Sequence, residues 1–186
     1  MVSPHNLRAL LAQGKHGLSR GRVPEIAALI MVRPRLASRL IECLWDDDEG
    51  VAQRAADVLE RISHKPSPEI ARVLAESKEA LLSLMEEARP NKLRWNLALV
   101  VGRLPLTVPE ARRAAAALQS WLGDSSSIVK TAALQGLADL TRRDPSLLPM
   151  ALDLLRMKGR SGTAAMRARS RILLKKLERP REREDL

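Results

Sequence analysis

The sequence reads Val51-x3-Ala55-Ala56-x-Val58-Leu59-x2-Ile62 in its first third, and the same phrase returns three more times. The later copies are Leu93-x3-Leu97-Ala98-x-Val100-Val101-x2-Leu104, Val129-x3-Ala133-Leu134-x-Gly136-Leu137-x2-Leu140 and Met166-x3-Ser170-x2-Leu173-Leu174-x2-Leu177. The first residues of successive copies are 42, 36 and 37 positions apart. Apolar or small residues at offsets 0, 4, 7, 8 and 11 form one stripe of a helix with about 3.6 residues per turn. Recurrence over this distance is typical of stacked helical hairpins.

A first helix is expected before each copy of the phrase, because the chain repeats a helix-opening signal. The openings are Pro24-Glu25, Pro68-Glu69, Pro109-Glu110 and Asp144-Pro145-Ser146. Proline suits the first helical position, and an adjacent glutamate meets the positive end of the helix dipole. Pro34 falls inside the first of these helices, so we expect that helix to kink or break there. The pattern predicts an all-α solenoid of about four to five antiparallel helix pairs.

The repeats divide the chain into consecutive units of about 22–66, 67–105, 106–143 and 144–178, which we expect to form a single domain. Residues 1–21 are expected to be an N-terminal capping helix or arm, with the helix itself near 4–13. Residues 179–186 mix arginine with acidic residues and are predicted to be a disordered charged tail.

The second helices resemble those of HEAT repeats, in which Val-Lys or Met-Arg is followed by Ala-x-x-x-Leu spacing. The best match is Val129-Lys130-Thr131-Ala132-Ala133-Leu134-Gln135-Gly136-Leu137. The resemblance covers residues 22–178 and is weakest in the fourth unit. It implies a right-handed superhelix whose second helices line the concave face. HEAT arrays serve many unrelated partners, so the resemblance is informative about fold and not about function.

Composition limits the kinds of ligand. Apolar residues make up 45% of the chain, but there is no Phe and no Tyr, and only Trp45, Trp95 and Trp121 are aromatic. Platforms that stack single-stranded bases need exposed aromatic rings, and small-molecule pockets are usually lined by them. We therefore expect no cofactor and no small-molecule substrate.

The single cysteine, Cys43, excludes an internal disulfide and favours a reducing compartment. It lies in an apolar helical stretch and is interpreted as a core thiol. No window reaches the ~18 apolar residues of a membrane span, and residues 7–12 are too short for a signal sequence. These features predict a cytoplasmic protein without a membrane span.

The net charge of +10 is unevenly distributed. Residues 1–40 carry +6, residues 41–155 carry −3 and residues 156–186 carry +7. Basic ends of this kind suit phosphates, acidic proteins or anionic lipid, whereas solvated helix faces are the plainer interpretation.

Three cations follow the first residue of a phrase: Arg94, Lys130 and Arg167. Stacked repeats would align them in a row that could bind a phosphate backbone or an acidic helix. The alternative is that each pairs with a helix end or with a turn carboxylate such as Asp47 or Asp124.

The last predicted helix is strongly basic. It carries Arg167, Arg169, Arg171, Lys175, Lys176 and Arg179, with Arg181 and Arg183 beyond it. A polar outer face is what a terminal repeat needs for solubility. The alternative interpretations of this basic helix are contact with nucleic acid and contact with a membrane surface.

Other clusters carry less chemistry. The acidic run Asp46-Asp47-Asp48-Glu49 lacks the spacing of a calcium loop, so we expect one carboxylate to cap the second helix and the rest to be solvated. His5, His16 and His64 are scattered and are interpreted as surface residues. Trp95 lies off the apolar stripe beside Arg94, which suits either an interaction hot spot or packing against the next unit.

The sequence thus favours a non-catalytic scaffold that binds a protein partner through the face formed by successive second helices. Arg94, Trp95, Lys130, Arg167, Arg169 and Arg171 are the candidate contact residues. Nucleic-acid binding through the basic ends is the alternative, and a HEAT-like DNA glycosylase is a distant third.

Overall fold

The protein is described from a computed structural model that covers residues 7–13, 21–87 and 91–178 of the 186-residue chain. Every regular element in these ranges is a helix, and the ranges contain no strand. The chain forms two compact units, Met1–Pro105 and Leu106–Leu186, which are described separately below. The predicted tail at 179–186 and the residues around His5 and His16 lie outside the described ranges.

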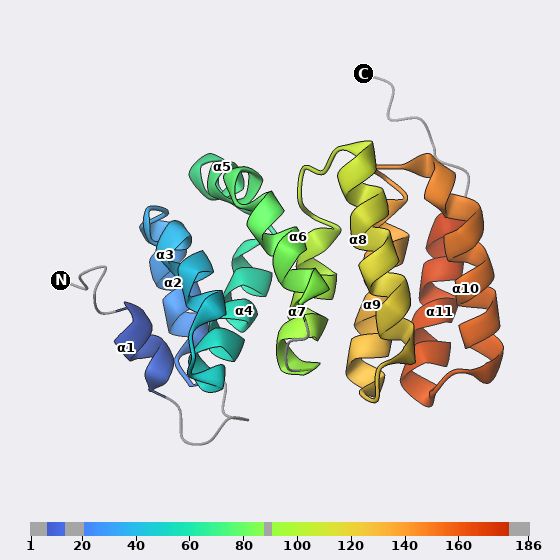
Figure 1. Cartoon of the computed structure of the whole chain (residues 1–186), viewed down its shortest axis with the longest axis horizontal. Helices are drawn as coiled ribbons and strands as arrows, with labels where there is room; N and C mark the ends of the chain where they lie inside the picture. The colour runs from blue at the N-terminus through green and yellow to red at the C-terminus, as the bar shows by residue number, and fades with distance from the viewer. Residues whose placement is uncertain (1–6, 14–20, 88–90, 179–186) are drawn as a thin grey trace. The chain divides into compact units, whose positions relative to one another are not determined.

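The first unit contains seven α-helices in its described part, coloured blue to green in Figure 1. They are α1 (Leu7–Ala12), α2 (Val23–Val32), α3 (Leu36–Glu42), α4 (Glu49–Ile62), α5 (Pro68–Glu76), α6 (Lys78–Glu86) and α7 (Asn91–Val101), with a short 3-10 turn, η2 (Cys43–Trp45), before α4. Helix α4 is central, because it packs against α1, α2, α3 and α7.

The first helices of both repeats in this unit are broken in two. The first break confirms the expectation from Pro34, since α2 ends at Val32 and α3 begins at Leu36. The second break, at Ser77 between α5 and α6, was not predicted. Neither proline nor glycine marks it, and serine is only a moderate helix former whose side chain competes for backbone hydrogen bonds.

Helix α1 closes one side of this unit. Leu7, Leu10 and Leu11 are buried, and each fully buried leucine contributes roughly 1.5–3 kcal/mol. Nε of Arg54, a buried residue of α4, donates to the carbonyl oxygen of Leu11. Arg8 of α1 forms a two-point ion pair with Asp46, with Nε–Oδ2 and Nη2–Oδ1 distances of 2.6 and 2.8 Å. Apolar burial and two arginine contacts therefore hold α1 in place.

The second unit contains α8 (Val108–Ser120), α9 (Ser127–Leu140), α10 (Leu148–Ser161) and α11 (Ala164–Leu177). Two short 3-10 turns, η3 (Trp121–Gly123) and η4 (Pro145–Leu147), precede α9 and α10. The four helices lie side by side in the yellow to red part of Figure 1. Their core includes Leu134 and Ala138 of α9, Leu155 of α10, and Met166 and Leu173 of α11.

Burial of the repeated phrase confirms the helical-repeat interpretation. The four residues at offset 0 are all buried: Val51, Leu93, Val129 and Met166. At offset 4 the residues are again all buried: Ala55, Leu97, Ala133 and Ser170. The protein is all-α and has a helical repeat fold. The right-handed sense of the superhelix, membership of the HEAT family and the single-domain organisation stay predictions.

Candidate functional site

A pocket of about 460 Å³ opens on the first unit, between the second helices α4 and α7. Its lining consists of Val23, Asp57, Glu60, Arg61, His64, Trp95, Asn96 and Leu99. Three of these residues lie on α4 and three on α7, His64 lies just after α4, and Val23 belongs to α2. The pocket therefore occupies the face that the two second helices share.

The polar part of the lining is held in place by hydrogen bonds between the two helices. Asn96 Nδ2 donates to Asp57 Oδ1 at 2.7 Å, and Asn96 is only 2% exposed. His64 Nε2 lies 2.8 Å from Glu60 Oε1, which also accepts from Arg103 Nη2 at 2.8 Å. The carboxylates are thus fixed in position before any partner arrives.

Arg103 ties the end of α4 to the end of α7. Besides the contact with the Glu60 carboxylate, its Nη1 donates to the main-chain carbonyl of Glu60 and to Ser63 Oγ, both at 2.8 Å. Last-turn carbonyls of a helix have no partner within the helix, and a cation near them also meets the negative end of the helix dipole. Arg103 therefore acts as a cap contributed by the neighbouring helix.

The second unit repeats this pattern between α9 and α11. Arg169 Nη1 donates to Gln135 Oε1 at 3.3 Å, and Lys176 Nζ lies 3.4 Å from Asp139 Oδ1. Counted from the start of each phrase, Asp57 and Gln135 share offset 6, Asn96 and Arg169 share offset 3, and Arg103 and Lys176 share offset 10. Within each unit, neighbouring second helices are joined by polar contacts in the same register.

Trp95 is the aromatic member of the pocket and is partly buried on α7. Arg94, beside it, is also partly buried. Trp121 is buried in the second unit, as expected for a residue covering the core edge, and Trp45 is partly buried. Of the three tryptophans, Trp95 is the one that lines the pocket.

The predicted cationic row is divided between the two units. Arg94 lies on α7 of the first unit, and Lys130 and Arg167 lie on α9 and α11 of the second. Arg167 is exposed, and its Nη1 donates to the carbonyl oxygen of Gly162 at 2.8 Å. This contact with a nearby helix end is the alternative that the sequence allowed. The row itself stays a prediction.

The contacts of the acidic turn at residues 46–49 differ in part from the expectation. Asp48 caps α4, because its Oδ1 accepts from the backbone nitrogens of Gly50 and Val51 at 2.8 and 3.2 Å. The expectation that the other acids are solvated is wrong for Asp46, which pairs with Arg8. The same hydrogen bond lowers the pKa of Asp46. Asp47 is exposed, and Asp124 accepts from the backbone nitrogen of Ser126 at 2.7 Å.

The remaining titratable candidates are few. Cys43 is partly buried, and burial raises the pKa of its thiol, which makes it a poor nucleophile. His64 is exposed, as expected for a surface histidine. In the described ranges, no three His, Cys, Asp or Glu side chains are grouped to hold a metal ion. None of the described helices has the length and apolar character that crossing a bilayer requires.

Sequence reasoning found Trp95 but missed the rest of the pocket, namely Val23, Asp57, Glu60, Arg61, His64, Asn96 and Leu99. A signal was present, since a polar residue stands at offset 10 in all four copies of the phrase and at offset 3 in three of them. The sequence pattern pointed instead to the cations at offset 1, Arg94, Lys130 and Arg167.

These observations define an all-α helical-repeat protein with a pocket on one pair of second helices. No known protein family and no curated protein matches the chain. Among solved structures it is similar to the designed armadillo repeat protein YIII(Dq)4CqI, with 14% sequence identity and a TM-score of 0.44. That likeness covers 94% of this chain and 91% of the designed chain.

Proposed function

We propose that this chain is a non-catalytic scaffold that binds a protein partner through its second helices, with the pocket around Trp95 as the central contact. The observation that carries the proposal is the pocket between α4 and α7, which places a partly buried tryptophan beside fixed polar groups. Tryptophan is enriched among the residues that dominate binding energy at protein interfaces.

The lining favours a polypeptide over a small molecule. Pockets for small molecules are predominantly apolar, whereas five of the eight lining residues here are polar or charged: Asp57, Glu60, Arg61, His64 and Asn96. Val23, Trp95 and Leu99 supply an apolar part. A peptide segment brings both a side chain to pack on Trp95 and main-chain groups to hydrogen-bond with the polar lining.

The rigid setting of the polar groups also favours binding. Asp57 is held by Asn96, and Glu60 is held by Arg103. Groups that are already ordered lose little conformational freedom when a partner binds.

The single cysteine fits a reducing compartment, so we propose a cytoplasmic location for the protein.

The test is photo-cross-linking with the full chain. A photoreactive residue replaces His64, which is exposed at the pocket, and in a matched control it replaces Ala80, which is exposed on α6. We expect a discrete cross-linked protein from His64 only, and we expect Trp95→Ala to abolish it while thermal unfolding shows that the chain remains folded. Equal cross-linking from Ala80, or cross-linking that survives Trp95→Ala in the folded protein, would contradict the proposal.

A further inference from the structure

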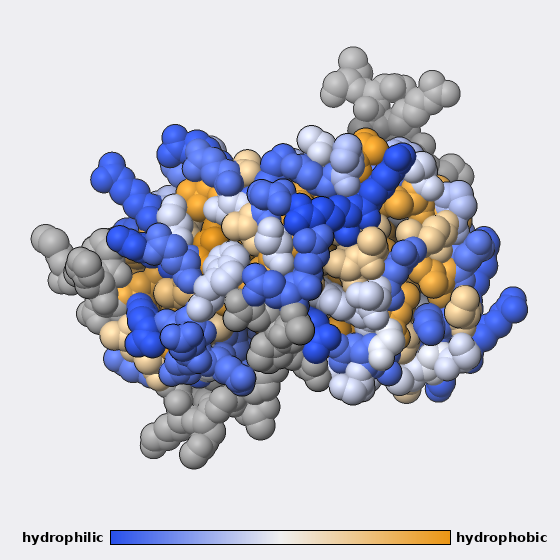
Figure 2. Space-filling view, viewed as in Figure 1, coloured by the Kyte–Doolittle hydropathy of each residue, from blue (hydrophilic) through white to orange (hydrophobic). Residues whose placement is uncertain are grey.

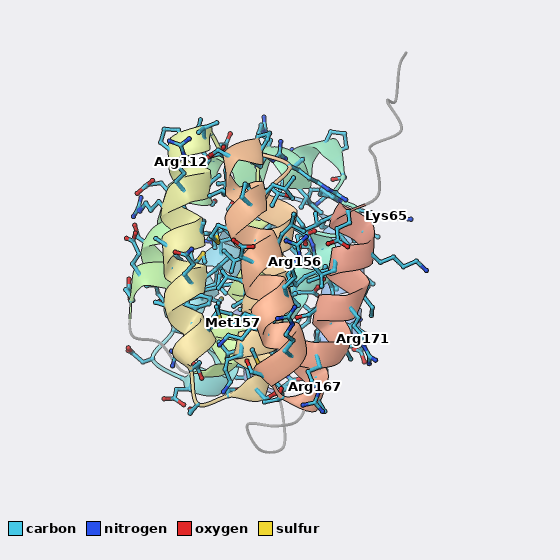
Figure 3. The ribbon with its side chains drawn as sticks, turned by 90° about the vertical axis from the view of Figure 1, so that its right-hand side faces the viewer. Lys65, Arg112, Arg156, Met157, Arg167 and Arg171 are labelled. Atoms are coloured by element: carbon cyan, nitrogen blue, oxygen red, sulfur yellow. The ribbon has the colours of Figure 1, made fainter. Side chains whose placement is uncertain are left out.

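Helix α11 presents three cations at intervals of one helical turn. Arg167, Arg171 and Lys175 follow one another at every fourth position, and all three are exposed. Four residues of α-helix rise about 6 Å, so the three side chains form a line along the helix. Figure 3 shows Arg167 and Arg171 on this helix. These three residues are called the α11 basic face below.

The charge of this face is not neutralised within the described chain. The second unit has thirteen Lys and Arg but six Asp and Glu over residues 106–178. All six acids are engaged elsewhere: Glu110 and Asp124 with backbone nitrogens, Asp139 with Lys176, Asp144 with Arg112, and Asp153 and Glu178 with Arg156. Over the same residues, neither Arg171 nor Lys175 forms an ion pair, so their charge remains available to a partner.

The face lacks the features of a protein-binding surface. Protein interfaces are usually centred on large apolar or aromatic residues, and charged residues are depleted there. Helical spacing puts Ala164 and Ala168 beside the cations on the same side of α11, and Ile172 is the large apolar residue of α11 that is exposed next to them. Interfaces with nucleic acid are more polar and much more positive. A polyanion therefore fits this face better than a protein.

The second unit is also unsuited to single strands. Proteins that bind single-stranded nucleic acid stack the bases on exposed aromatic rings. Trp121 is the one aromatic residue in the whole of 106–186, and it is 6% exposed. Phosphate contacts alone do not require unstacked bases, and arginine can bind phosphate through two parallel hydrogen bonds.

We propose that the α11 basic face binds the backbone phosphates of duplex nucleic acid without sequence preference. Arg167, Arg171 and Lys175 each contact a phosphate, and the small side chains of Ala164 and Ala168 let the backbone approach the helix. Arg169 and Lys176 do not take part, because they are engaged with Gln135 and Asp139 on the side facing α9. This surface is independent of the pocket around Trp95.

The test measures binding of the full chain to a 20-base-pair DNA duplex of mixed sequence by fluorescence anisotropy at several salt concentrations. Each phosphate contact contributes about 0.9 to the slope of log affinity against log salt. We expect a slope of about −2.7 for three contacts. A duplex of different sequence should bind with the same affinity, and an RNA duplex distinguishes the two forms of nucleic acid.

The decisive comparison uses two double variants that remove equal charge from the same unit. R171A/K175A should weaken binding roughly tenfold or more and reduce the slope by about 2. R142A/R143A alters two exposed arginines after α9 and should have a much smaller effect. All four side chains are exposed, so both variants should unfold at the temperature of the parent protein.

Several outcomes would overturn the proposal. They are equal losses in the two double variants, affinity for the duplex that does not depend on salt, and tighter binding to oligo-dT, to poly-glutamate or to phosphatidylserine vesicles than to the duplex. A specific loss in R171A/K175A with a reduced slope would support it.

Discussion

Arg103, in the turn after α7, is joined to Glu60 of α4 by two hydrogen bonds. The guanidinium donates to the carboxylate and to the main-chain carbonyl of Glu60, both at 2.8 Å. One side chain thus satisfies a carbonyl in the last turn of α4 and pairs with a carboxylate of the same helix. In the second unit, Lys176 lies at the same offset of its phrase as Arg103, but its partner Asp139 lies one offset later than Glu60, and the pair is held at 3.4 Å by one hydrogen bond. The cation at offset 10 therefore makes a strong contact in the first unit and a weak one in the second.

Replacing each of the two cations by alanine should show this difference in strength as a difference in the free energy of unfolding. Arg103→Ala removes hydrogen bonds to partly buried acceptors and should lower the free energy of unfolding of the first unit by about 1–3 kcal/mol. Lys176→Ala removes a more exposed pair and should cost the second unit about 0–1 kcal/mol. Urea denaturation followed by fluorescence resolves the two, since Trp45 and Trp95 lie in the first unit and Trp121 in the second. If both variants lost the same free energy of unfolding, the number of hydrogen bonds that each cation makes would not determine its contribution to stability.

The acidic turn before α4 offers a matched pair of neighbours. Asp48→Ala removes the helix cap and should destabilise the first unit by about 1 kcal/mol. Asp47→Ala alters an exposed side chain and should change stability by less than about 0.5 kcal/mol. Thermal unfolding of both variants is the measurement. If Asp47→Ala proved the more damaging, the assignment of the cap would be wrong.

The ion pair between Arg8 and Asp46 makes the docking of α1 depend on pH. The hydrogen bond from Arg8 lowers the pKa of Asp46 in the folded state. The stabilising contribution of the ion pair is therefore complete above the ordinary aspartate pKa of about 4, and it is lost as the pH falls through the lowered pKa of Asp46 in the folded state. We expect Asp46→Asn to reduce stability at pH 7 and to make the loss of stability on acidification shallower. Acid titration of the first unit checks this, and an equally steep loss of stability in Asp46→Asn would contradict it.

Much of the fold could be predicted because apolar periodicity is a local signal. The phrase beginning at Val51 places its apolar residues on one helical face, and the residues at that face are buried. Pro34 breaks a helix through its own ring, so that break was predicted as well. The break at Ser77 was missed, because serine is only a weak local signal for a helix end.

The candidate site was harder to predict because it depends on register between helices. Trp95 stood out by residue type alone. The pairing of Asp57 with Asn96, 39 positions apart, requires knowing which turns of α4 and α7 lie opposite each other. Arg54 was missed for the same reason, since its burial follows from the docking of α1, whose side chains cover α4. Long-range contacts of this kind leave only a weak trace in a single sequence.

Both hydrophilic and apolar side chains reach the surface of each unit. Figure 2 shows hydrophilic side chains mixed with smaller apolar patches on the visible face of each unit. Over the described residues, the large hydrophobic side chains that are exposed include Val32, Ile128, Met157 and Ile172. Scattered apolar residues of this kind are normal on a soluble surface, so they do not by themselves mark an interface.

Gly162 and Gly123 form the last matched pair, because both end a helical segment but differ in the space around them. A Cβ atom added at Gly162 would lie 2.4 Å from the carbonyl oxygen of Lys158 and 2.9 Å from Met166 Cβ, whereas at Gly123 it would meet nothing within 4 Å. The backbone φ at Gly162 is −77°, so the requirement for glycine is steric and not conformational. Gly162→Ala must shift the backbone of this turn relative to Lys158 or Met166 and should destabilise the second unit by about 1–3 kcal/mol. Gly123→Ala should be neutral or stabilise it by up to about 1 kcal/mol through the unfolded state. Thermal unfolding followed by Trp121 fluorescence decides between them, and a neutral Gly162→Ala would mean that the turn between α10 and α11 is not packed as closely as described.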